Sequence, residues 1–124
     1  MFVGKHAISD IEFDVDIDLT SSNSTVIINA MSAAVRAVGA TIMSVENFGF
    51  GENEGFTATL ILAESHMSIH TWPEYNLATV DIFMCGDCDA FAALEFFYNY
   101  LESAELKFVK KTESKINRGW VNVS

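Results

Sequence analysis

The sequence predicts an α+β fold, a two-layer sandwich in which a mainly antiparallel sheet carries two helices on one face. Three observations support this fold class. Apolar and acidic residues alternate near the N-terminus, two segments have apolar residues at helical spacing, and the expected elements follow the order β-α-β-β-β-α-β. Strands joined by short turns pair antiparallel. At 124 residues, the chain has the size of one domain.

The first two elements are expected before residue 40. Five apolar side chains alternate with five acidic ones over residues 8–19, which predicts a strand with one buried and one wet face. Residues 20–24 form a polar break with several possible N-caps. A helix then follows over residues 26–38, where six apolar side chains form one stripe, and Gly39 can end it.

The middle of the chain predicts three more strands. Residues 41–50 and 56–63 flank the turn sequence GENEG at residues 51–55. The second of these strands is apolar on both faces, which is typical of a central strand. Residues 77–84 predict the next strand of the sheet.

The last part of the chain predicts a helix and a short strand. Asp87 or Asp89 can cap a helix over residues 90–101, which is rich in aromatic side chains. A strand is expected over residues 106–110, and no pattern assigns the tail at residues 116–124. Since the predicted sheet has apolar residues on both faces, we expect a second copy of the chain to cover the face without helices, giving a homodimer.

Charge and composition exclude several classes of function. The chain carries seven basic and 17 acidic residues, so its net charge of −10 argues against nucleic acid and anionic membrane surfaces as partners and favours cationic or zwitterionic ones. No apolar run approaches the roughly 18 residues of a membrane span, and the N-terminus lacks a signal-peptide pattern. Two cysteines do not make a disulfide framework, so the cytoplasm is the expected location.

Most residues with chemical potential lie between residues 64 and 88. One generic hypothesis is a zinc module of two histidines and two cysteines, namely His66, His70, Cys85 and Cys88. The C-x-x-C pair could alternatively serve redox chemistry, although it does not open a helix after a first βαβ strand. Both signals are weak, and ordinary structural roles for these side chains outweigh them.

A long motif gives a sharper indication. The run AESHMSIHTWPEYNLATVDIFMCG over residues 63–86 contains the core E-S-H-x-[ST]-I-H-T-W-P-E-Y. This segment closely resembles the short, prokaryotic type of S-adenosylmethionine decarboxylase. The G-K-H sequence at residues 4–6 and the G-A-T-I sequence at residues 39–42 match the same family in the same order. The resemblance covers most of the chain, with near-diagnostic motifs in about a fifth of it.

The resemblance implies a self-processing enzyme with a pyruvoyl cofactor made from its own backbone. The Ser65 hydroxyl would attack the carbonyl of Glu64, and cleavage between these residues would give chains 1–64 and 65–124. The pyruvoyl group left at position 65 would form a Schiff base with the substrate amine and accept electrons as CO2 departs. The implied substrate is S-adenosylmethionine, and the product is an aminopropyl donor for the synthesis of polyamines such as spermidine.

The resemblance also assigns roles to single residues. His70 would move protons during self-cleavage, and Cys85 would return a proton to the substrate α-carbon. Glu74 would bind the ribose hydroxyls. Three residues, Met67, Ile69 and Trp72, would form an apolar wall around the substrate, and Phe48 or Phe50 would stack on the adenine. No metal is implied.

One position departs from the family pattern. The family usually has a serine that assists cleavage where this chain has Thr57. Threonine keeps the hydroxyl but adds a methyl group and restricts χ1, which predicts slower processing. Two alternatives stay open: a pyruvoyl-dependent ornithine or arginine decarboxylase, which keeps the chemistry and changes the substrate, and an unprocessed, catalytically silent binding or regulatory subunit, which Thr57 favours.

Overall fold

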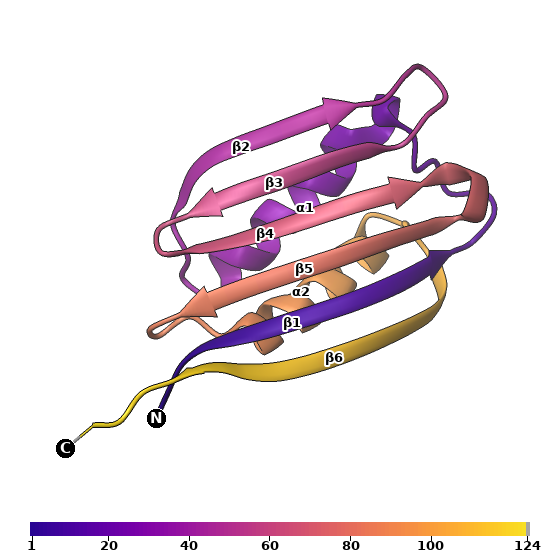
Figure 1. Ribbon diagram of the computed structural model, residues 1–124. Helices are drawn as coiled ribbons and strands as arrows, with labels where there is room; N and C mark the ends of the chain where they lie inside the picture. Colours follow the sequence, from indigo (N-terminus) through magenta and orange to yellow (C-terminus); the bar gives the residue numbers. More distant parts are fainter. Residues whose placement is uncertain (124) are drawn as a thin grey trace.

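A computed structural model describes residues 1–123 as one six-stranded sheet with two α-helices packed on one face (Figure 1). The strands and helices are β1 (Phe2–Phe13), α1 (Ser24–Ala37), β2 (Ile42–Gly49), β3 (Phe56–Leu62), β4 (Ser65–Trp72), β5 (Leu77–Cys85), α2 (Ala90–Ser103) and β6 (Phe108–Trp120). Short 3-10 turns at Ser21–Asn23 and Pro73–Tyr75 complete the elements. The predicted α+β two-layer sandwich is confirmed.

The sheet has the strand order β2-β3-β4-β5-β1-β6, and each neighbouring pair is antiparallel. Strands β2 to β5 form a meander, because short turns join them in sequence. Strand β1 adds beside β5, and β6 then adds beside β1, so both ends of the chain lie at one edge of the sheet (Figure 1).

Two expected strand boundaries are wrong, and one strand was not expected. The first strand ends at Phe13, because the amide of Ile17 bonds to the carbonyl of Asp14 and folds the acidic segment into a turn. The segment Ser65–Trp72 is a strand of its own, which makes six strands instead of five. The last strand continues from Phe108 to Trp120 and so includes the first part of the unassigned tail; Ser124 lies outside the described residues.

The two faces of the sheet differ in character. Alternate side chains of β3, β4 and β5 are fully buried under the helices and form most of the core. The other set points away from the helices and is half-buried or exposed; we call this the open face. The candidate site residues described below come mainly from the open face.

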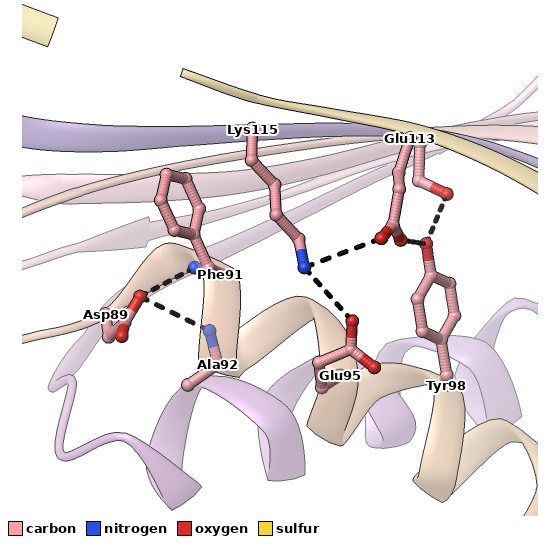
Figure 2. Close-up of polar contacts among 8 residues, drawn as sticks. Asp89, Phe91, Ala92, Glu95, Tyr98, Glu113 and Lys115 are labelled. Atoms are coloured by element: carbon pink, nitrogen blue, oxygen red, sulfur yellow. Dashed lines mark hydrogen bonds and ion pairs between the residues drawn. The ribbon is translucent and has the colours of Figure 1, made fainter. Parts of the chain in front are cut away.

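The outer strand β6 is held by side chains of α2 (Figure 2). The Tyr98 hydroxyl lies 2.7 Å from Ser9 Oγ and donates to Glu113 at 2.7 Å. Lys115 Nζ lies 3.3 Å from Glu95 and 3.5 Å from Glu113. The hydrogen bond from Tyr98 and the nearby lysines hold the pKa of Glu113 below its ordinary value, whereas burial raises the pKa of Tyr98. This polar network replaces the apolar contacts that β6 lacks.

Removing the Tyr98 hydroxyl is expected to loosen this attachment. Tyr98→Phe leaves the buried Ser9 hydroxyl unpaired and costs about 1–3 kcal/mol of unfolding free energy at pH 7. Because the pKa of Glu113 is lowered by folding, its contribution exists above the pKa of an unfolded glutamate, about 4.3, and disappears as the pH falls below it. The variant should therefore lose less stability than the wild type between pH 7 and pH 3.

Urea unfolding at the two pH values measures both effects. Tyr100→Phe is the matched control, since it removes a hydroxyl from a partly exposed tyrosine of the same helix. Equal unfolding free energies for Tyr98→Phe and Tyr100→Phe would contradict the role given to the network.

Candidate active site

The turn between β3 and β4 presents the peptide bond that precedes Ser65. Leu62 pairs with Ser65, so the turn holds only Ala63 and Glu64. Glu64 has a φ of 65°, in the left-handed region that glycine or asparagine normally occupies. A non-glycine residue in this region stores about 1–3 kcal/mol of strain. The two-residue turn directly before Ser65 thus holds its backbone in a strained conformation.

The carbonyl group of this bond has a side-chain partner. Cys85 at the end of β5 is half-buried, and its Sγ donates to the carbonyl oxygen of Glu64 at 3.1 Å. A donor at this oxygen stabilises negative charge that develops there when a nucleophile attacks the carbonyl carbon. The Ser65 hydroxyl belongs to the adjacent residue. Glu64, Ser65 and Cys85 therefore form one group, which we call the turn group.

A second group lies at the other end of β4. It consists of Thr57, His70, Trp72, Phe48 and Phe50, and we call it the aromatic group. His70 Nδ1 is 2.6 Å from the Thr57 hydroxyl, across the β3–β4 pair. The ring of His70 lies 4.2 Å from the ring of Trp72 and 5.6 Å from that of Phe50. Phe48 lies 5.4 Å from Phe50 and is exposed.

Glu74 follows this group in the turn Pro73–Tyr75 and is exposed. A hollow of about 230 Å³ on the open face runs beside His70 and Thr57, between β3 and β5. Pockets that bury most of a drug-sized ligand usually have volumes of about 300–1,000 Å³. One chain thus supplies a wall with aromatic rings and a carboxylate, but only part of a pocket.

The structure does not bring the two groups together. Ser65 and His70 are five positions apart in the same strand. At about 3.3 Å per residue, their Cα atoms are separated by about 17 Å, which no histidine side chain spans. Within one chain, His70 therefore cannot exchange a proton with Ser65.

Two of the predicted wall residues have their side chains in the core. Met67 and Ile69 point under the helices, and their exposed fractions are 0% and 1%. Their neighbours His66, Ser68 and His70 take the open face, because side chains alternate along a strand. Both side chains belong to the core, although Ile69 also borders the hollow beside His70. A contact of either residue with the substrate stays a prediction. Trp72 alone of the three predicted wall residues reaches the open face.

The zinc hypothesis finds no support in the geometry. Among residues 1–123, no group of three or more histidine, cysteine or acidic side chains could hold a metal ion. His66 contacts Asp81, whereas His70 contacts Thr57. Cys85 and Cys88 both have free thiols.

Two contacts of the site cannot be read from sequence spacing alone. Cys85 meets the Glu64 carbonyl across 21 positions, and only the pairing of β4 with β5 explains why. The contact between Thr57 and His70 spans 13 positions and follows from the register of the β3–β4 hairpin. Since the register depends on the length of the turn, an assigned two-residue turn would have been the signal for it.

Comparisons with known proteins point to one family. A model of the S-adenosylmethionine decarboxylase family matches residues 6–113. The S-adenosylmethionine decarboxylase proenzyme of Pyrobaculum islandicum is 37% identical over 106 residues, which are 85% of this chain and 83% of that protein. The proenzyme of Pyrobaculum arsenaticum is 42% identical over 82 residues, which are 65% of this chain and 66% of that protein.

The fold has a solved counterpart. The crystal structure of the adenosylmethionine decarboxylase from Aquifex aeolicus superposes with a TM-score of 0.79 at 29% identity, covering 99% of this chain and 96% of that one. In the described part of the chain, neither helix has the length and apolar character needed to cross a membrane. The match of the family model over most of the chain, together with these relatives, shows that the chain belongs to the S-adenosylmethionine decarboxylase family.

Proposed function

We propose that this chain is the proenzyme of a pyruvoyl-dependent decarboxylase that cleaves itself between Glu64 and Ser65 and then acts on S-adenosylmethionine. The observation that carries the proposal is the contact of the Cys85 thiol with the carbonyl of Glu64, at a strained turn directly before a serine. Membership of the family and the proenzyme names of the relatives support it.

The proposed cleavage uses groups that the turn already holds. Ser65 Oγ attacks the carbonyl carbon of Glu64, the C–N bond breaks, and the amide becomes an ester. Loss of the Ser65 α-proton then breaks the ester by elimination, so residues 1–64 leave with a free carboxylate. Hydrolysis of the resulting enamine releases ammonia and leaves a ketone at the start of residues 65–124. Cys85 stabilises the oxygen charge in the first step.

The residues of the turn group fit a pyruvoyl cofactor at position 65. No protein side chain supplies an electrophilic ketone, and this group supplies an electron sink for the charge left when CO2 departs. Cys85, paired with the carbonyl of residue 64 before cleavage, would carry a proton beside the same position afterwards. It would deliver that proton to the substrate α-carbon.

We further propose that each active site combines two chains. The separation of about 17 Å between Ser65 and His70 requires a different source for the proton-transfer group of the turn. A two-fold pairing of the open faces can bring the turn group of one protomer to the aromatic group of its partner, because the two groups lie at opposite ends of β4. The small hollow beside His70 supports this arrangement, since a second copy would enclose it.

The aromatic group suits a nucleoside. The Glu74 carboxylate can accept hydrogen bonds from two ribose hydroxyls, and the rings of Trp72, Phe48 and Phe50 can stack on adenine. The net charge of −10 favours a substrate with a sulfonium and an ammonium group. We place the enzyme in the cytoplasm, which its two unpaired cysteines support.

Product analysis tests the substrate. We expect the purified protein to release CO2 from carboxyl-labelled S-adenosylmethionine and to prefer it to ornithine or arginine by at least about 10³ in kcat/KM, because those amino acids leave the nucleoside wall unfilled. A preference for ornithine or arginine would refute the substrate. Binding of S-adenosylmethionine by a chain that stays uncleaved would favour a silent binding subunit, the alternative that Thr57 at the usual serine position supports.

A further inference from the structure

Four polar side chains form a continuous chain of contacts across β4, β5, β1 and β6 on the open face. Asp81 Oδ1 lies 3.2 Å from His66 Nε2 and 2.9 Å from His6 Nε2. Arg118 Nη1 lies 2.8 Å from Nδ1 of His6. We call these four residues the histidine clamp. None of them has a role in the cleavage or decarboxylation steps proposed above.

The chemistry of the four groups fixes the direction of each bond. A guanidinium group can only donate, so Nδ1 of His6 accepts from Arg118 and the proton of this ring sits on Nε2. A carboxylate only accepts, so both histidines donate their Nε2 protons to Asp81. Asp81 is therefore the centre of the clamp, and removing its carboxylate releases His66.

A phenylalanine ring supports the same histidines. The ring of Phe83 is stacked near that of His66, with 6.1 Å between centroids, and meets His6 edge-on at 6.0 Å. A Cβ atom at Gly4 would lie 2.7 Å from the Phe83 ring, so glycine leaves the room that this ring needs. The ring of His66 is thus held by a hydrogen bond and by an aromatic neighbour.

His66 lies next to the chain end that self-cleavage would create. Cleavage before Ser65 would turn β4 into the first strand of a new chain, with His66 as its second residue. The covalent link to β3 would be lost, and free strand ends fray unless something ties them down. The new end would carry the reactive ketone, so fraying would displace the reacting atom.

We propose that Asp81 is a positioning residue, which holds His66 and thereby fixes the N-terminal end of β4 after self-cleavage. The inference rests on the proposed cleavage at Glu64–Ser65. His6 belongs to the N-terminal product, and the other three residues belong to the C-terminal product, so the clamp also joins the two products. It matters little before cleavage, because the β3–β4 turn then holds the same end of the strand.

Hydrogen exchange of the amides at residues 66–70 tests the proposal. In the cleaved Asp81→Ala protein, these amides should exchange about tenfold faster than in the cleaved wild type, the factor that one charge-assisted hydrogen bond provides. The same substitution in the uncleavable Ser65→Ala chain should change exchange by less than about twofold. Asp10→Ala, which removes another carboxylate from the same face, is the matched control.

Activity gives a second readout. Asp81→Ala should lower kcat about tenfold. Asp81 itself borders the hollow beside His70, so KM is read from His66→Phe, in which it should change less than about twofold. His66→Phe keeps the stacking on Phe83 but cannot donate, so it should cause the same loss. The double variant should be no worse than either single one, and His66→Phe serves alone if Asp81→Ala does not fold.

Three results would overturn the inference. The first is unchanged exchange in the cleaved Asp81→Ala protein, and the second is an equal increase in the Ser65→Ala background, which would mean general support of the sheet. The third is a failure of the Asp81→Ala chain to cleave itself, since Asp81 would then be needed for self-cleavage and not for holding the strand afterwards. A wild-type chain that never cleaves would instead refute the proposed function. The mass of the wild-type protein therefore distinguishes a failure of the proposed function from a failure of this inference.

Discussion

Replacing Cys85 by alanine is expected to abolish decarboxylation while self-cleavage still goes to completion. The proposed role of the thiol in the reaction is proton delivery to the substrate carbon, and losing such a group costs about 10²–10⁴ in rate. In self-cleavage, the thiol is one weak donor to the Glu64 carbonyl, so its loss should slow cleavage only about tenfold. Mass spectrometry follows the cleavage, and release of labelled CO2 follows the reaction.

Cys85→Ser separates the two roles of the thiol. A hydroxyl donates to the Glu64 carbonyl, so cleavage should approach the wild-type rate. A serine hydroxyl is a far weaker acid than a thiol, so decarboxylation should remain strongly reduced. Decarboxylation at the wild-type rate by Cys85→Ala would contradict the assigned role. Incomplete cleavage of Cys85→Ala would also contradict it if the cleaved fraction were fully active.

Mixing two inactive variants is expected to restore activity if each site combines two chains. Ser65→Ala cannot form the ketone, and His70→Ala lacks the proposed proton-transfer group of cleavage. In a mixed dimer, the intact Ser65 of one chain would face the intact His70 of the other, so one of the two sites is complete and about half of the wild-type activity should return. Co-expression with two affinity tags isolates the mixed dimer.

The matched control pairs Ser65→Ala with Cys85→Ala. These residues belong to the turn group of one chain, where Cys85 contacts Glu64 directly. Every site in this mixed dimer lacks one of the two residues, so activity should not return. No rescue by the first pair would place Ser65 and His70 in the same chain and contradict the two-chain site. Rescue by the control pair would mean that Ser65 and Cys85 of one site come from different chains and contradict the turn group.

Much of the fold follows from hydrophobic periodicity. The apolar stripe of α1 and the side chains of β3 and β5 are visible in the sequence, because burial under a single helical layer selects them. Only the start of strand β6 is predicted, since Glu113 and Lys115 stand where apolar residues would normally face a helix. These two side chains make polar contacts with α2, so β6 lacks the alternation of apolar and polar residues on which the prediction of a strand depends.

The predictable part of the site is its composition. Ser65, His70 and Cys85 are marked by a long motif, but a motif does not say which residues meet. Their separation into the turn group and the aromatic group depends on strand geometry, as does the burial of Met67 and Ile69. Both properties follow directly once Ser65–Trp72 is known to be a strand, and this is the strand that the sequence analysis does not assign.

The central claim, self-cleavage before Ser65, is tested most directly by the mass of the purified protein under denaturing conditions. The account predicts two products of about 7 kDa each, half of the 13.7 kDa chain, and a reaction of the C-terminal product alone with a carbonyl reagent. The Ser65→Ala chain should stay whole. A wild-type chain that remains a single 13.7 kDa species on long incubation would contradict the account.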